Sequence, residues 1–263
     1  MIDAAGLASA GLRVDRAGDV LTVTLDRPAR LNAQTPAMWA ALAGIGASLP
    51  GDVRVIVLRG AGTAFSSGLD VSAFDTGIDG AARTSLAGLA LMPEAAALEL
   101  IASYQAAFTW WSRPDVISIA AVQGYAIGAG FQLALACDLR IAADDVQMSL
   151  PEATRGLVPD LGGTAALVRA VGYSRALEIA VTGRRVGAAE AYRLGLVNLV
   201  VQPAELDAAV SDCVAAVAAV DRNTATDLKS LLSGALGRTA QQQLAEEREA
   251  QLRRLKDGSG IGD

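Results

Sequence analysis

Two continuous apolar runs constrain the fold of this chain more than any other feature of its sequence. Residues 53–58 and 116–122 are short and rich in Val and Ile, which is typical of strands buried on both faces. Helical periodicity covers residues 33–49, and a longer helical stretch at 81–111 is interrupted at Pro93. Strands that alternate with helices predict right-handed βαβ units and a largely parallel sheet, so the expected fold class is α/β.

The two ends of the chain differ in pattern. Residues 20–25 alternate apolar and polar side chains, which indicates a half-buried strand. The C-terminal third is almost wholly helical, apart from one short apolar run at 196–201. We therefore predict a core domain over residues 1–200 and a helical region over residues 201–263, with a flexible tail at 257–260.

The composition excludes several classes of function. A formal charge of −6 and an aromatic content of 4% do not suit a nucleic-acid binder, which needs a basic surface and stacking platforms. The chain has no histidine, so Ser-His-Asp and Cys-His triads, His metal sites and His general bases are excluded. Any proton transfer must therefore use carboxylates, Lys, Tyr or water.

The cysteines and the absence of a long apolar segment indicate a cytoplasmic protein. Cys137 and Cys213 lie in apolar helical patterns, where reduced core thiols are expected and a nucleophilic role is the minor alternative. We expect no membrane association, because each apolar stretch is too short to cross a bilayer and the N-terminus lacks the pattern of a secretory signal.

Two loops rich in small residues follow the two buried strands. Residues 65–70 read FSSGLD, and residues 128–130 read GAG at the start of a helical pattern. Such loops leave backbone N–H groups free to point at a ligand, and the dipole of a helix N-terminus favours negative charge. A pair of donors, one from each loop, can bind a thioester oxygen as it becomes an enolate.

Other interpretations of the same loops are weaker. Each loop taken singly is compatible with an ordinary tight turn. A dinucleotide-binding fingerprint fits poorly, because Leu133 stands where a third glycine is needed. A P-loop is absent, since no Gly-Lys-Ser/Thr follows a glycine-rich segment.

A series of short motifs extends from the first strand into the C-terminal third. They are RP…LNA (27–33), VRVIVLRG (53–60), FSSGLD (65–70), AAVQGYAIGAG (120–130), ACDLRIA (136–142), PE (151–152), GLVPDLGGT (156–164) and TGRR to GLV (182–197). In this order the motifs resemble those of the crotonase, or enoyl-CoA hydratase/isomerase, family over roughly residues 12–202.

The resemblance implies a fold, a substrate and a set of binding residues. It implies a spiral of ββα units with a C-terminal helical region, a homotrimer or dimer of trimers, and an acyl-CoA thioester substrate with no metal or other cofactor. The backbone N–H groups of Leu69 and Ala129 match the oxyanion-hole donors, although the family more usually has Gly where Ala129 stands. The positions matched to substrate binding are Arg27, Arg30, Ala33, Ser67, Gly68, Asp70 and Gly128. The two arginines would contact the CoA phosphates or simply be solvated.

Three polar side chains match catalytic positions of the family. Hydratases use two glutamates around one water, at the positions of Gln132 and Glu152. An amide exchanges no proton at neutral pH, so Gln132 can orient water or substrate but cannot be half of an acid/base pair. Asp160 matches a second acid of dienoyl-CoA isomerases, which usually also carry an acid where Gln132 stands. It is equally compatible with the N-cap of the helical pattern that follows.

The combined residues favour an enzyme that shifts a double bond. Leu69 and Ala129 would stabilise a thioester enolate, while Glu152, with or without Asp160, would move the proton. The alternatives are a hydratase in which Glu152 acts and Gln132 positions water, a catalytically silent acyl-CoA-binding protein, and another thioester reaction on the same scaffold.

Overall fold

A six-stranded sheet in the order β1-β2-β3-β4-β6-β9 lies at the centre of the fold. The computed structural model describes residues 4–70 and 86–259. The strands are β1 (Leu12–Ala17), β2 (Val20–Leu25), β3 (Val55–Gly60), β4 (Ile117–Val122), β6 (Leu139–Ala143) and β9 (Leu199–Val201). Only the β1–β2 pair is antiparallel, and the other neighbours pair in parallel. This arrangement confirms the predicted α/β class.

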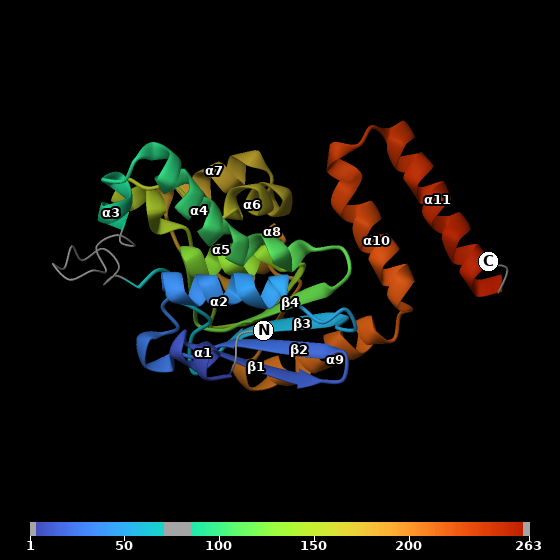
Figure 1. The fold of residues 1–263 in the computed structure, drawn as a ribbon, viewed down its shortest axis with the longest axis horizontal. Helices are drawn as coiled ribbons and strands as arrows, with labels where there is room; N and C mark the ends of the chain where they lie inside the picture. The colour runs from blue at the N-terminus through green and yellow to red at the C-terminus, as the bar shows by residue number, and fades with distance from the viewer. Residues whose placement is uncertain (1–3, 71–85, 260–263) are drawn as a thin grey trace.

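Helices cover both faces of this sheet, as Figure 1 shows for α2, α4 and α5 on one side and α9 on the other. The helices are α1 (Ala4–Ser9), α2 (Pro36–Ala47), α3 (Leu86–Ala90), α4 (Glu94–Thr109), α5 (Ala129–Ala136), α6 (Gly163–Val171), α7 (Tyr173–Thr182), α8 (Ala188–Leu194), α9 (Leu206–Ala218), α10 (Arg222–Gly234) and α11 (Ala240–Ser259). The predicted break at Pro93 is the N-cap of α4, whereas residues 81–85 of the expected helical stretch lie outside the described residues.

The alternation of side chains along β3 explains why both faces are covered. Ile56 and Leu58 point into the larger core, whereas Val55 and Val57 join a second cluster that contains Leu206 of α9. Because successive residues of a strand face opposite sides, a continuous apolar run needs a packed layer on each side.

The segment after β2 shows how local sequence starts a helix. Pro36 opens α2, and the hydroxyl of the N-cap residue Thr35 accepts a hydrogen bond from the backbone N–H of Met38 at 3.2 Å. Proline suits the first helical position because its missing N–H would have no partner there. The helix then places Trp39 on its buried side, against the core.

A small second sheet holds the loops that follow β3 and β4. It consists of β5 (Tyr125–Ile127), β7 (Gln147–Ser149) and β8 (Val186–Gly187). Ser66 joins the loop after β3 to β5, because its N–H donates to Tyr125 O at 2.8 Å and its O accepts from Ile127 N at 3.0 Å. The two glycine-rich loops are thereby held side by side at the carboxyl ends of parallel strands.

The C-terminal helices differ in how they pack. Helix α9 lies on the sheet, while α10 and α11 form an arm that Figure 1 shows set apart from the rest of the chain. Lys229 fastens α10 to the core, since its Nζ donates to Val116 O and to Asp138 Oδ2, both at 2.7 Å. The boundary at residue 200 stays a prediction.

Two details of the C-terminal third differ from expectation. The expected flexible tail is wrong for residues 257–259, because α11 continues to Ser259. The two-residue strand β8 was not expected, because so short a segment shows no periodicity. The apolar run at 196–201 does contain a strand, β9.

Candidate active site

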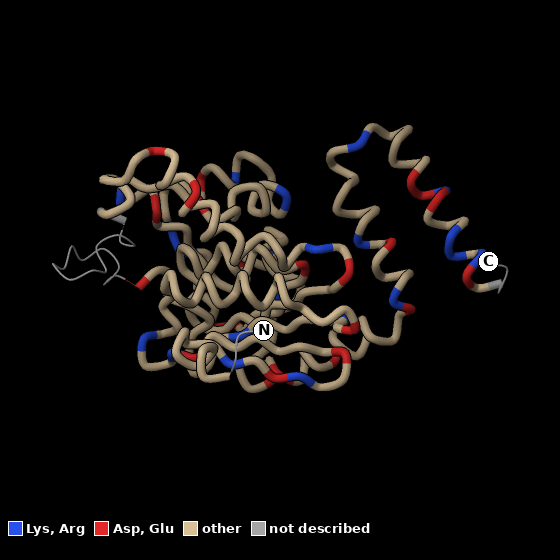
Figure 2. Tube along the Cα trace, viewed as in Figure 1, with Lys and Arg blue, Asp and Glu red and all other residues tan. Residues whose placement is uncertain are grey.

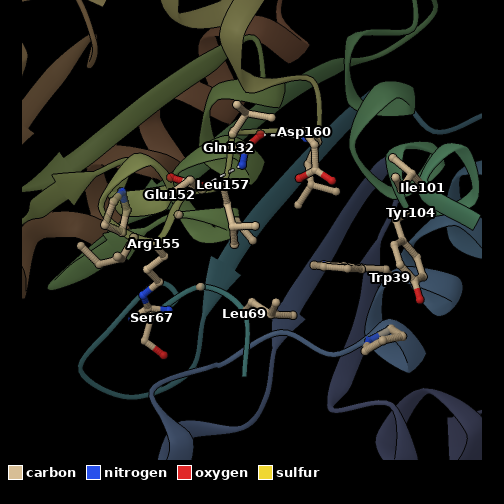
Figure 3. A pocket seen from close by; sticks show the side chains of 18 of the residues that line it. Trp39, Ser67, Leu69, Ile101, Tyr104, Gln132, Glu152, Arg155, Leu157 and Asp160 are labelled. Atoms are coloured by element: carbon tan, nitrogen blue, oxygen red, sulfur yellow. Dashed lines mark hydrogen bonds between the residues drawn. The ribbon is translucent and has the colours of Figure 1, made fainter. Parts of the chain in front are cut away.

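A cavity of about 380 Å³ opens where β3 and β4 end. It is bounded by α2, α4, the start of α5 and the 3₁₀ helix Pro151–Arg155. Figure 3 shows Gln132 and Glu152 on one side of it, with Trp39 and Tyr104 on the other. The lining includes eight predicted site residues: Ser67, Gly68, Leu69, Gly128, Ala129, Gln132, Glu152 and Asp160.

The N–H of Leu69 is directed by the peptide unit that precedes it. Gly68 O accepts from Gln34 N at 2.7 Å, and Asp70 N donates to Gln34 O at 2.9 Å. In a trans peptide the C=O and the following N–H point in opposite directions, so the Leu69 N–H faces away from Gln34. Within the described residues this N–H has no acceptor.

The second donor begins helix α5. Ala129 is the first residue of α5, and its N–H has no acceptor within residues 4–70 and 86–259. Gly128 before it has φ +53°, a conformation in which alanine at 128 would be strained. Ala129 itself is helical, so having alanine rather than the more usual glycine at position 129 leaves this turn intact.

Gly68 shows how closely the two donors converge. A Cβ built on Gly68 would lie 2.5 Å from Ile127 O and 3.6 Å from the backbone N of Ala129. The backbone of the first loop therefore lies against the start of α5, with no room for a side chain at position 68. The two backbone donors therefore belong to segments in direct contact, and an oxyanion hole formed by both stays a prediction.

Glu152 lies beside these donors with one oxygen bound and one unbound. Its Oε1 accepts from Gln132 Nε2 at 2.9 Å, and it would be 3.4 Å from a Cβ on Gly128. Its Oε2 is buried and, within the described part of the chain, has no hydrogen-bond partner. Burial raises the pKa of Glu152, while hydrogen bonds from its backbone and from Gln132 lower it, and the charge of Asp160 raises it.

Gln132 is held in a single orientation. Its Oε1 accepts from Leu161 N at 3.0 Å and from Gly163 N at 3.3 Å, so its Nε2 must face Glu152. A Cβ on Gly163 would lie 2.6 Å from the Gln132 side chain, which shows how tightly α6 covers it. The amide therefore donates to a carboxylate rather than standing free in the cavity.

Asp160 reaches the same cavity from the loop before α6, and Figure 3 shows its carboxylate directed into the pocket. Burial raises its pKa. Gln105 of α4 holds the loop, because its Nε2 donates to the backbone O of Asp160 at 2.7 Å. The N-cap alternative is wrong: α6 begins after Gly162, which has φ 89°, and no side chain caps that end.

The apolar wall of the cavity comes from residues that sequence reasoning did not identify as part of the site. Trp39 and Tyr104 pack with ring centroids 4.9 Å apart. Other apolar side chains of the lining include Pro36, Leu89, Ile101, Leu157, Val158 and Leu161. These residues belong to ordinary helical and loop patterns, so only the tertiary arrangement distinguishes them from core. Arg155, which was also missed, supplies a positive charge that lowers the pKa of Glu152.

The other predicted substrate-binding residues do not line the cavity. Arg27 and Arg30 both contact Asp70, with Nη2 to carboxylate distances of 3.0 and 3.1 Å. Arg27 also donates to the backbone O of Ala33. Asp70 is buried, and it therefore organises the two arginines outside the cavity. Their contact with CoA phosphates stays a prediction.

The Trp pair and the cysteines are structural. Trp110 and Trp111 stack with centroids 4.0 Å apart, and neither lines the cavity. Cys137 is buried, which raises the pKa of its thiol to about 12, and neither cysteine forms a disulfide. A thiolate nucleophile at Cys137 is therefore excluded at neutral pH.

Charge distribution, possible metal ligands and helix hydropathy add three findings. Figure 2 shows acidic and basic residues intermixed over the body and the arm. The described residues contain no group of His, Cys, Asp or Glu side chains that could hold a metal ion. Of the helices in residues 4–70 and 86–259, none combines the length and apolar character needed to cross a membrane.

Comparison with known proteins gives matches over most of the chain. The enoyl-CoA hydratase/isomerase family model matches residues 15–257. Carnitinyl-CoA dehydratase of Escherichia coli K12 is 38% identical over 201 residues, covering 75% of this chain and 70% of that protein. The peroxisomal multifunctional protein MFP2 of Arabidopsis thaliana is 39% identical over 155 residues, 59% of this chain and 20% of its own length.

Solved structures match the chain over nearly its whole length. A candidate enoyl-CoA hydratase from Thermobifida fusca YX in complex with CoA is 47% identical, with a TM-score of 0.91 and 98% of both chains covered. The same protein with acetoacetyl-CoA has a TM-score of 0.92 over 97% of this chain and 99% of the other. The fold and these matches define a protein of the crotonase superfamily. Within that superfamily, the chain belongs to the enoyl-CoA hydratase/isomerase family.

Proposed function

We propose that this enzyme shifts a carbon–carbon double bond in an enoyl- or dienoyl-CoA through a thioester enolate. The observation that carries the proposal is one cavity with two carboxylates, Glu152 and Asp160, beside two backbone donors that have no acceptor among the described residues. Burial raises the pKa of both carboxylates, which brings them closer to the pH at which a proton can be both taken and returned.

In this mechanism the thioester oxygen accepts hydrogen bonds from the N–H groups of Leu69 and Ala129. Ionised Glu152 removes a proton from the α- or vinylogous γ-carbon, and the electron pair moves into the carbonyl to give an enolate. Protonated Asp160, or Glu152 itself, then returns a proton at another carbon of the conjugated system. One proton leaves and one is added, so the product is an isomer of the substrate.

Gln132 supports isomerisation over the two-glutamate form of hydration. An amide at this position cannot give a proton to a substrate carbon or take one from water. Its Oε1 already accepts from two backbone N–H groups, and its Nε2 already donates to Glu152. We assign Gln132 the role of holding Glu152 in its ionised form.

Hydration or dehydration is the second candidate, because relatives carry the names carnitinyl-CoA dehydratase and enoyl-CoA hydratase. In that reaction Glu152 would activate water, and the one Nε2 hydrogen of Gln132 not bound to Glu152 would orient it. A catalytically silent acyl-CoA-binding protein is the third candidate function.

The test follows 3,5-dienoyl-CoA and 2-enoyl-CoA by absorbance and by NMR in D₂O. Isomerisation predicts a shift of conjugation without water addition. Two-carboxylate isomerisation predicts its loss by at least about a hundredfold in both Glu152→Gln and Asp160→Asn, whereas loss in Glu152→Gln alone would assign both proton transfers to Glu152. Water addition by the wild type, unaffected by Asp160→Asn, would establish hydration instead. If the wild type is an isomerase, Gln132→Glu should give it additional hydratase activity. Binding of acyl-CoA without turnover of either substrate would identify a silent binder.

We also propose that three copies of the chain associate through the arm, as a trimer or a pair of trimers. The support is the exposure of large apolar side chains on α10 and the turn after it, with Leu232 73% exposed and Leu236 79% exposed. Exposed apolar patches of this kind are typical of protein–protein contacts.

A cytoplasmic location stays a prediction.

A further inference from the structure

Gln34 links the apolar wall of the cavity to the loop that carries an oxyanion donor. Its Oε1 accepts from Trp39 Nε1 at 2.8 Å, and its Nε2 donates to Ser66 Oγ at 3.1 Å. Trp39 lines the cavity, and both Gln34 and Ser66 are completely buried. The indole N–H can only donate, so the orientation of the amide is determined by its two partners.

Ser66 carries this connection to Gly68. Its Oγ donates to Asn32 O at 2.8 Å and accepts from Gly68 N at 3.2 Å as well as from Gln34. A hydroxyl has one hydrogen and two lone pairs, so every hydrogen-bonding position of Ser66 Oγ is occupied. Gly68 is thus held through its N–H by Ser66 and through its O by the backbone of Gln34.

Ser66 also contacts the element that carries the second donor. A Cβ on Gly130 would lie 2.5 Å from Ser66 O and 2.8 Å from Ser66 Cβ. Ser66 therefore packs directly against the first turn of α5, one residue after Ala129. A shift of the Ser66 side chain would alter the separation of the two loops from which Leu69 N–H and Ala129 N–H converge.

We propose that Gln34 is a positioning residue for enolate stabilisation: it couples the Trp39 wall, where the acyl group of the substrate would lie, to the direction of the Leu69 N–H. Gln34 does not line the cavity, so it acts through Ser66 and Gly68 rather than on the substrate. The inference rests on the proposed function, since it presumes an oxyanion hole that binds a thioester. Oxyanion donors accelerate a reaction only when they are held at the position of the developing charge.

The first test is Gln34→Met, which keeps the length of the side chain and removes both hydrogen bonds. We expect kcat to fall about tenfold, equivalent to about 1.4 kcal/mol of transition-state stabilisation, while KM changes less than about twofold. Trp39→Phe, which keeps an aromatic wall and removes only the indole N–H, is the second variant. If the two residues act as one unit, the double variant should lose much less than the product of the single losses.

A spectroscopic readout separates positioning from folding. Acetoacetyl-CoA ionises to an absorbing enolate when an oxyanion hole stabilises it, so we expect a smaller enolate fraction in saturated Gln34→Met than in the wild type. Ser118→Ala is the stability control, because Ser118 Oγ is buried and bonded to Trp111 O and Asp138 at the opposite end of β4. It should lower Tm without changing the enolate fraction or kcat.

The outcomes distinguish this inference from the proposed function. If the wild type turns over its substrate and Gln34→Met has the same kcat and the same enolate fraction, the inference is overturned and the proposed function stands. Enolate formation that decreases in Gln34→Met, without turnover of any enoyl or dienoyl substrate, would support the inference and refute the proposed reaction. A wild type that neither ionises acetoacetyl-CoA nor turns over substrate would overturn both.

Discussion

At the scale of single residues, Gln132 is one of the groups that influence the pKa of Glu152. Its Nε2 donates to Glu152 Oε1 at 2.9 Å, and a hydrogen bond to the charged form of an acid favours that form. Burial acts in the opposite direction and raises the pKa of Glu152. The proton affinity of the proposed base therefore reflects burial, which raises the pKa, and hydrogen bonds from its own backbone and from Gln132, which lower it.

This balance predicts the pH dependence of the reaction. As a base, Glu152 must be ionised, so activity should rise with pH through its pKa, above the ordinary range for a glutamate. Asp160, whose pKa is also raised, would act as the acid in its protonated form. Activity should therefore fall as the pH rises through the pKa of Asp160. Gln132→Met removes the donor that lowers the pKa of Glu152 and should move the acid limb of the kcat profile to higher pH.

The control for this prediction is Gln123→Met. Gln123 Nε2 donates to Gly60 O and Gly62 O outside the cavity, so its replacement should leave both limbs of the pH profile unchanged. A shift of the acid limb to lower pH in Gln132→Met would contradict the assigned role. Loss of the bonds to Leu161 N and Gly163 N should also lower the stability of this variant, by about 1–3 kcal/mol.

At the scale of elements, the close contact of two loops would form the proposed oxyanion hole. We expect Gly68→Ala to lower kcat/KM at least about a hundredfold, comparable with the loss of an oxyanion donor. The added Cβ would lie 2.5 Å from Ile127 O, at a φ of +91° that alanine rarely adopts. Steady-state kinetics with the enoyl or dienoyl substrate measures the effect.

A matched glycine separates local strain from loss of the site. Gly18, in the turn between β1 and β2, has φ +61°, and a Cβ there would meet nothing within 4 Å. Gly18→Ala should cost about 1 kcal/mol of stability, because alanine is strained in this conformation, and should leave kcat/KM unchanged. Equal kinetic losses in the two variants would show that Gly68 matters only for folding.

At the scale of the whole molecule, α10 and α11 form the arm through which we propose that copies of the chain associate. Its two helices are joined by ion pairs from Arg253 and Arg254 to Asp227, at 2.9 and 2.7 Å. Lys229 anchors the arm to Asp138 through a buried contact. The arm is therefore fastened to the core while its leucines Leu232 and Leu236 are exposed.

We predict that Leu232→Asp combined with Leu236→Asp dissociates the assembly. Burying two carboxylates in an apolar contact is unfavourable unless each finds a partner. Sedimentation of the wild type should give a trimer or a multiple of it, and the double variant should sediment as a monomer. Leu91→Asp is the control, because Leu91 is 88% exposed but lies after α3, away from the arm. A monomeric wild type would refute the assembly.

Much of the fold was predictable because its signals are local. The apolar runs that form β3 and β4 and the proline that opens α2 each act within a few residues of sequence. The strands of the second sheet, only two or three residues long, carry no periodicity, and their pairing depends on residues far along the chain.

The sequence by itself determined the chemistry available: no histidine, an amide at 132, carboxylates at 152 and 160, and two small-residue loops after buried strands. Only the tertiary structure decided how these groups are used. It turned the amide of Gln132 toward Glu152, excluded Asp160 from the helix cap, paired both arginines with Asp70 and made Trp39 a wall of the cavity. The physical reason is that hydrogen-bond partners and burial depend on contacts between distant segments, which no local pattern encodes.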